Sequence, residues 1–140
     1  MANLMYTNFW KHLGEGNIDL EDDTIKCALV TSSYSPNQDT HEYFDDVTNE
    51  VAGTGYTAGG ATLGSVAVTA DTTNNRAKVD AVDTEWSSAT ITFRAAVIYK
   101  STGTASTSPL IAYYDFTDNQ VASSQDVTIQ WNASGTFAIG

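Results

Sequence analysis

The side chains able to do acid–base or nucleophilic chemistry are two histidines, one cysteine and many serines and carboxylates. A nucleophilic triad brings a Ser or Cys together with a His and an acid, and this chain offers only His12 and His41 as imidazoles. The Gly-x-Ser-x-Gly turn that presents a nucleophilic serine does not occur. Cys27 alternates with Ile25 and Leu29, which predicts a small core residue with an inert thiol. We therefore assign no catalytic residue and expect a protein that is not an enzyme.

Carboxylates cluster twice, in Asp19-Leu20-Glu21-Asp22-Asp23 and in Asp45-Asp46. Calcium takes about six to eight oxygen ligands, and its loops usually contain a glycine at the sharp turn. The first cluster has no glycine in register. We expect a solvated acidic edge at each cluster, with no bound metal and no cofactor. Glycosidase-type carboxylate pairs stay open as an alternative, because the chain has 17 acidic residues.

The stretch Gly53–Gly60 is rich in glycine and carries Tyr56 at its middle. A Walker loop ends in Gly-Lys-Ser/Thr and opens a helix, and a dinucleotide-binding fingerprint needs a β-α-β context. Neither pattern is present, and residues 44–75 contain no lysine. The stretch leads into a predicted strand, so we interpret it as a turn with bulges.

Three tryptophans and seven tyrosines would suit a platform on which a sugar ring stacks. Trp131 alternates with Val127 and Ile129 and is expected in the core, whereas Trp86 follows a turn and is expected to be half exposed. Trp10 is unusual, because an exposed aromatic near a terminus needs something to cover it.

Composition narrows the function classes. The chain has 140 residues, of which 16% are charged and 41% hydrophobic, and its net charge of -11 would repel a phosphate backbone. We therefore expect no nucleic-acid partner. A single cysteine excludes an internal disulfide framework. No apolar run approaches the ~20 residues of a membrane span, and the start lacks the pattern of a signal peptide, so we expect no membrane partner.

From residue 24 onward the apolar residues alternate with period two, and turn signals separate the alternating runs. This pattern predicts an all-β, single-domain antiparallel β-sandwich of about seven strands. The predicted strands are Thr24–Ser32, Ala61–Ala70, Arg76–Val82, Thr90–Lys100, Leu110–Phe116, Asp126–Trp131 and Thr136–Ile139. The side chains expected to face inward include Ile25, Leu29, Val79, Phe93, Val97, Val127, Ile129 and Trp131.

The first 23 residues differ from the rest. Residues 1–23 are expected to form an N-terminal arm with a short amphipathic helix, and residues 24–140 the β-sandwich body of one domain. Asp39 and Glu42 have the spacing of a capping box that opens a second short helix. Ser101–Pro109 is expected to be an exposed flexible loop.

Several segments resemble a family of small structural proteins of tailed double-stranded DNA bacteriophages. The most distinctive of them is Gly53–Leu63, and together the segments extend over nearly the whole chain. The others are Ile18–Val30, Tyr43–Val51, Ala95–Lys100 and Ser108–Ala112.

The resemblance implies a non-enzymatic virion protein, assembled in the bacterial host cytoplasm, and favours a capsid decoration or cement protein that stabilises the head. Its expected partners are the major capsid protein or other virion proteins, together with further copies of itself, and a trimer would suit threefold lattice positions. Two alternatives stay open: a neck, tail or baseplate component, and a module that binds a host glycan.

The N-terminal arm is the candidate assembly interface. It contributes an apolar stripe to which Tyr56 is added from the glycine-rich stretch. A terminal helix this short needs its apolar face covered, either by a neighbouring subunit or by its own sheet. The residues of this candidate interface are Leu4, Met5, Phe9, Trp10, Leu13 and Tyr56.

Overall fold

The computed structural model describes residues 3–131 and 137–139, and it confirms an antiparallel all-β fold with a short N-terminal helix. In this part of the chain there are eight strands, one α-helix and two 3-10 turns. Their bounds are β1 (Leu4–Met5), α1 (Thr7–Gly14), β2 (Ile25–Val30), η1 (Phe44–Asp46), β3 (Ala61–Thr62), β4 (Ala67–Asp71), β5 (Arg76–Asp80), β6 (Thr84–Lys100), η2 (Ala105–Thr107), β7 (Leu110–Ile129) and β8 (Phe137–Ile139).

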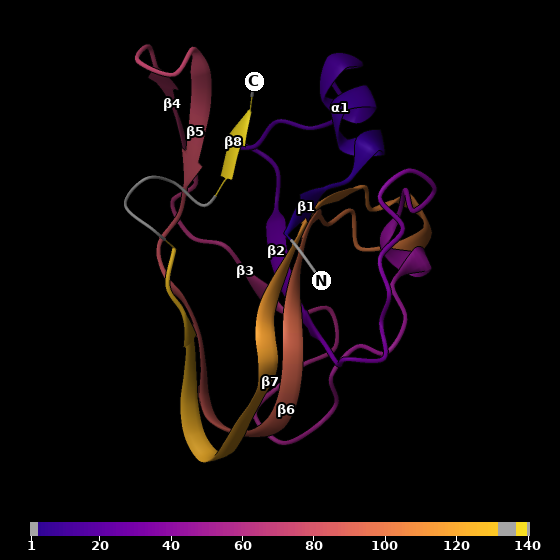
Figure 1. Ribbon diagram of the computed structural model, residues 1–140, viewed down its shortest axis with the longest axis vertical. Helices are drawn as coiled ribbons and strands as arrows, with labels where there is room; N and C mark the ends of the chain where they lie inside the picture. Colours follow the sequence, from indigo (N-terminus) through magenta and orange to yellow (C-terminus); the bar gives the residue numbers. More distant parts are fainter. Residues whose placement is uncertain (1–2, 132–136, 140) are drawn as a thin grey trace.

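The strands form two sheets, one of five strands in the order β1-β7-β6-β2-β3 and one of three in the order β4-β5-β8. The long strands β6 and β7 pair with each other and form the centre of the larger sheet. Figure 1 shows this ribbon as a U that turns at the bottom of the view and rises again toward β8. Apolar side chains from both limbs, including Trp86, Phe93 and Val127, join one core.

Two bulges, one in each strand, bend the ribbon into this U. Ser88 in β6 and Ser124 in β7 adopt positive φ angles of 50° and 49°. Each displaced amide donates to a side chain of the opposite strand: Ser88 N–H to Asp126 Oδ1 at 2.8 Å, and Ser124 N–H to Thr90 Oγ1 at 3.0 Å. Bulges bend a strand and increase its twist. These two bulges, each held by a hydrogen bond to the opposite strand, therefore explain why the ribbon folds back.

The larger sheet is buried on both faces where β2 lies beside β6. Cys27 belongs to the main core cluster, whereas Ala28 and Val30 belong to a second cluster. The prediction that Cys27 is a core residue is confirmed, since its side chain has no exposed surface and burial raises the pKa of its thiol.

The alternation along β6 changes face twice, first at the Ser88 bulge and again after Phe93. Phe93 lies in the main cluster with Ile98, whereas Val97 lies in the second cluster. Between Phe93 and Ala95 the ladder to β7 is irregular, because residues 116–119 are inserted on the β7 side. The alternation of β6 shifts at the same place, so that its residues beyond Phe93 face the opposite way from those before it. The prediction that Phe93 and Val97 share one inward face was therefore wrong, although both are buried.

Two strand predictions have different bounds in the structure. The predicted strand Ala61–Ala70 is split into β3 and β4, which belong to different sheets, and Ser65 between them takes a φ of 50°. A single strand, β7, covers the predicted strand Leu110–Phe116 and most of the predicted strand Asp126–Trp131. The two predicted strands are continuous because the bulge at Ser124 bends β7 without ending its pairing with β6.

The start of β6 was also predicted wrongly. This strand begins at Thr84 rather than Thr90, so Trp86 lies within the sheet instead of in a turn. Trp86 is only 6% exposed, against the prediction that it is half exposed. Trp131 packs half-buried against the main cluster. Of the last predicted strand, β8 covers Phe137–Ile139, and Thr136 lies outside the described residues.

At the N-terminus, Leu4 and Met5 pair with β7 as strand β1, and the helix begins only at Thr7. The prediction that Leu4 and Met5 lie on the helix was therefore wrong. The capping box predicted from Asp39 to Glu42 was wrong as well. Residues 38–40 form a turn capped by the side chain of Asn37, and the short 3-10 helix begins later, as η1.

Candidate functional site

His12 lies on α1, is 5% exposed, and uses both of its ring nitrogens. Nε2 lies 3.0 Å from Glu42 Oε1, and Nδ1 lies 3.3 Å from the side-chain amide of Asn17. The carboxylate needs a donor and the amide nitrogen is one, so the network assigns the proton to Nε2. Lys11 Nζ reaches the same Glu42 oxygen at 3.4 Å. His12 therefore links α1 to two loops and has no free nitrogen to act as a base.

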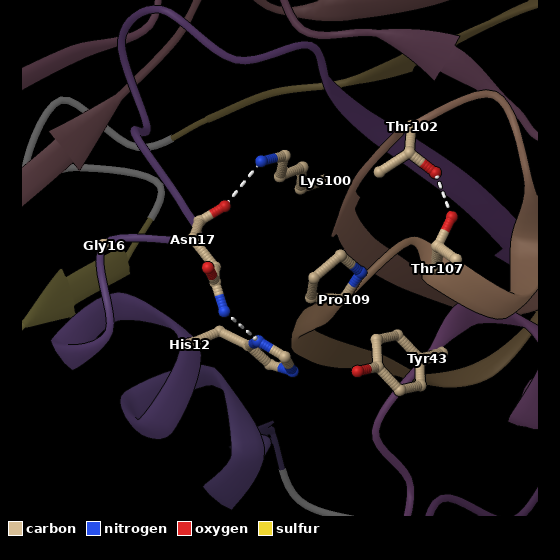
Figure 2. A pocket seen from close by; sticks show the side chains of 8 residues that line it. All are labelled: His12, Gly16, Asn17, Tyr43, Lys100, Thr102, Thr107 and Pro109. Atoms are coloured by element: carbon tan, nitrogen blue, oxygen red, sulfur yellow. Dashed lines mark hydrogen bonds between the residues drawn. The ribbon is translucent and has the colours of Figure 1, made fainter.

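A pocket of about 410 Å³ opens beside His12, between α1 and the loop that follows β6. Figure 2 shows Lys100 on one side of it and Tyr43 across from it. The Lys100 ammonium forms an ion pair with Asp23 Oδ2 at 3.0 Å and donates to the backbone carbonyl of Asn17. None of the residues that line this pocket is acidic. The lining therefore contains the ammonium of Lys100, whose charge is already paired with Asp23, and several neutral polar groups.

The loop on the far side of the pocket is tied together by its own hydroxyl groups. Thr102 Oγ1 and Thr107 Oγ1 lie 2.6 Å apart, and the buried Ser108 hydroxyl donates to the carbonyl of Thr104 at 2.8 Å. The threonine hydroxyls bond within the loop, whereas His12 bonds to other groups. The pocket is equipped to hydrogen-bond a small polar molecule, but it lacks the hydroxyl–imidazole pair of a nucleophilic site.

His41 belongs to a separate chain of hydrogen bonds. Its Nδ1 accepts from the backbone N–H of Asn37 at 3.3 Å and lies 2.9 Å from the Tyr34 hydroxyl, which is itself 2.9 Å from the Tyr6 hydroxyl. Burial raises the pKa of Tyr34 to about 12 and raises that of Tyr6 further still. Both phenols therefore stay protonated near neutral pH. The hydrogen bonds tie Tyr6, the residue between β1 and α1, to the loop after β2.

Glu50 organises the glycine-rich stretch. Its Oε2 accepts from the Tyr56 hydroxyl at 2.6 Å and from the Gly59 N–H at 2.7 Å. The Tyr56 hydroxyl in turn accepts from the backbone N–H of Leu29 at 2.9 Å. Burial and the bond to Glu50 both raise the pKa of Tyr56. The stretch is thus a closed turn held by a carboxylate, which agrees with its interpretation as a turn.

The structure brings five of the six candidate assembly residues onto the body of the same chain. Phe9 has no exposed surface, and Leu4, Met5 and Leu13 are half-buried against the core clusters. Trp10, next to Phe9, is 41% exposed. The sixth residue, Tyr56, lies in the Glu50 turn beside Trp86, with ring centroids 5.9 Å apart. The assembly role of this set stays a prediction, with Trp10 as the member that presents the most apolar surface.

The acidic run that begins at Asp19 folds into a turn. Asp19 Oδ1 accepts from the amides of Glu21 and Asp22, and Asp23 Oδ2 accepts from the amide of Asp19. Asp23 also pairs with Lys100, as described above. Across the described ranges, no group of three or more His, Cys, Asp or Glu side chains is placed to hold a metal ion.

Sequence reasoning missed the residues that organise these contacts. Glu42 joins His12 across 30 positions of sequence, and Lys100 reaches Asn17 across 83 positions, so local spacing carried no signal for either pair. Glu50 had a weak signal, since it precedes the glycine-rich stretch whose Tyr56 it binds.

The chain matches no protein-family model, no curated protein and no solved structure. Among the described residues, no helix has the length and apolar character needed to cross a membrane.

Proposed function

We propose that this chain is a structural protein of a bacteriophage virion, most specifically a decoration protein that binds the outside of the head. The main support for the proposal is that the reactive side chains are taken up in internal contacts, whereas apolar side chains are left exposed. Cys27, His12 and His41 are committed to the core or to internal hydrogen bonds, whereas Trp10 and Val121 remain exposed at 41% and 71%. Such a molecule presents exposed apolar side chains to other proteins on a body held together by internal hydrogen bonds.

The N-terminal segment supports the same role. β1, α1 and the loops they contact are joined by hydrogen bonds that include Gln38 Nε2 to the Met5 carbonyl at 2.8 Å and Thr7 Oγ1 to Asp39 at 2.7 Å. These contacts fix on the body the helix that carries Trp10. A helix already fixed before binding loses little conformational freedom on binding, which favours a lattice contact.

Cosedimentation with phage particles tests the proposal. Purified chain is expected to pellet with heads that lack it and to saturate at a fixed number of copies, and a density map of the intact particle should show it on the head. Trp10→Ala should weaken this binding, with Thr69→Ala, at an exposed position of β4, as the control. If the density lies in the neck, tail or baseplate, the chain is a structural component of that part and not a head decoration protein. If the particle contains no copy of the chain, the proposal is wrong.

A host-glycan-binding module is the second candidate, because of the pocket beside His12. The Tyr43 ring and Pro109 border it, and Thr102, Thr107 and Lys100 provide polar groups. Sugars are recognised by hydroxyl and amide hydrogen bonds beside an apolar ring face. Binding of host polysaccharide that is lost in Tyr43→Ala, without binding to heads, would favour this function over decoration.

A further inference from the structure

A second pocket, of about 320 Å³, opens where the loop that follows β6 meets the glycine-rich stretch and η1. Pockets that bind small molecules usually have volumes of about 300–1,000 Å³, so this one has room for a single small ligand. Its described lining contains one basic side chain, Lys26 of β2, and one acidic side chain, Glu50. Neither of these two residues lines the pocket beside His12.

Lys26 has no counter-ion among the described residues, although the chain has 17 acidic side chains. Its side chain is half-buried and forms no hydrogen bond with the described residues either. Four of the other five basic residues form ion pairs: Lys11, Arg76, Arg94 and Lys100. A half-buried charge is costly unless a group of opposite charge compensates it. The Lys26 ammonium is therefore available to an anionic group from outside the chain.

Tyr99 of β6 lies directly opposite Lys26 in the ladder between β2 and β6, but it does not supply the missing charge. Its hydroxyl donates to the Gly59 carbonyl at 2.5 Å, and burial raises the pKa of its phenol to about 12. Its ring stacks on Phe44 at a centroid distance of 4.0 Å. Near neutral pH, Tyr99 is therefore a neutral wall of the pocket.

The two charged groups of the lining both approach Gly59. Glu50 Oε2 accepts from the Gly59 N–H at 2.7 Å, and Lys26 Nζ lies 3.6 Å from the position that a Cβ on Gly59 would take. The two side chains are nevertheless too far apart to form an ion pair. Glu50 Oε1 accepts no hydrogen bond from the described residues. A positive and a negative group therefore line one small pocket, separated by about one residue, and both have bonding capacity left.

We propose that this pocket binds a free α-amino acid, with the ligand's carboxylate on Lys26 and its ammonium on Glu50. Hydrogen bonds to ionised groups are roughly twice as strong as bonds between neutral groups. A zwitterion has no net charge, so the field of a chain with net charge -11 does not repel it. A simple anion would meet that field and Glu50, and a simple cation would leave Lys26 without a partner.

The rest of the lining suits an amino acid with a small side chain better than it suits a sugar. Of the three aliphatic hydroxyls in the described lining, two are bonded within the loop. Ser101 Oγ accepts from the Gly103 N–H at 3.3 Å, and the Ser108 hydroxyl donates to the Thr104 carbonyl at 2.8 Å. A sugar needs several hydrogen-bonding partners, whereas the capacity left here lies chiefly on one cation and one anion.

Isothermal titration calorimetry of the full chain with L-alanine tests the site. L-Alanine is expected to bind, and propionate and isopropylamine, which each lack one of its charged groups, should bind at least about tenfold more weakly. Lys26→Met should weaken the binding of L-alanine by a similar factor. Lys78→Met is the matched control, because Lys78 of β5 is also half-buried and also lacks an ion pair among the described residues.

Circular dichroism and the melting temperature establish that each variant is folded. In NMR spectra, the amide signals of Lys26 and Gly59 should shift when L-alanine is added, since both residues border the ligand. The proposal is overturned if L-alanine does not bind, if propionate binds as tightly, or if methyl α-glucoside binds in its place. A loss in Lys78→Met equal to that in Lys26→Met would overturn it too. Trp10 does not line this pocket, so such a failure would leave the proposed binding to phage heads in place.

Discussion

Phe93 is a core residue inside the U, and replacing it tests how much one buried side chain adds to the free energy of unfolding. It is 4% exposed, and its ring meets Phe116 edge to face at a centroid distance of 5.7 Å. Phe93→Ala should lower the free energy of unfolding by about 3–5 kcal/mol, from lost transfer energy and a residual cavity. Thr92→Ala, one position along and exposed, should change it by less than about 0.5 kcal/mol. Urea denaturation checks both values, and a loss under about 1 kcal/mol for Phe93→Ala would contradict its burial.

Asp115 makes the stability of the folded protein depend on pH. The Arg94 side chain donates to its two carboxylate oxygens at 2.6 and 3.4 Å, and Thr117 N–H donates at 2.8 Å. These bonds hold the pKa of Asp115 well below its usual range. Hydrogen bonds from Asn74 and Arg76 likewise lower the pKa of Asp71 to about 2.

A carboxyl group whose pKa is lower in the folded state stabilises the protein above its unfolded pKa of about 3.9. As the pH falls below that value, the unfolded chain binds the proton first, and stability is lost down to the folded pKa. Urea midpoints should therefore stay level near neutral pH and fall steeply below about pH 4. Asp115→Asn should be less stable at neutral pH and should lose less on acidification. An unchanged acid slope in this variant would contradict the assignment.

At the scale of elements, the turn at Gly60 depends on the absence of a side chain. Its φ is +79°, and a Cβ there would lie 1.9 Å from the carbonyl oxygen of Cys27 in β2. Gly60→Ala should therefore destabilise the protein by more than about 4 kcal/mol or prevent folding, because the clash is with backbone. Gly14→Ala is the control: nothing lies within 4 Å of its Cβ position, and alanine favours the helix by up to about 1 kcal/mol. Melting temperatures of the two variants should move in opposite directions.

The elements also show what the sequence could predict and what it could not. Alternation located β2, β5 and most of β6, because side chains that alternate between two faces leave a period of two whatever the partner strand is. It could not show the bulges at Ser88 and Ser124. Serine is an ordinary strand-surface residue, and the side chains that accept the amides of these two, Asp126 and Thr90, lie 38 and 34 positions away in the sequence.

The candidate site was less predictable than the strands, for the same physical reason. His12 stood out by its residue type, but its role is set by Glu42 and Asn17, which come from other segments. A polar residue reveals its function through its partners, and those are fixed by tertiary contacts. Cys27 was the exception, since burial alone decides its reactivity and the apolar alternation predicted that burial.

At the scale of the whole molecule, Phe9 and Trp10 separate folding from assembly. They are neighbours on α1, with ring centroids 5.2 Å apart, but Phe9 is fully buried and Trp10 is 41% exposed. Phe9→Ala should lower the free energy of unfolding by about 3–5 kcal/mol, because α1 closes one side of the main core. Trp10→Ala should lower it by less than about 1 kcal/mol, and its effect should fall on binding to phage heads. Calorimetry and cosedimentation on the same preparations check the pair. Equal losses of stability in both variants would mean that the helix serves only to cover its own sheet, and normal head binding by Trp10→Ala would move the assembly contact elsewhere on the molecule.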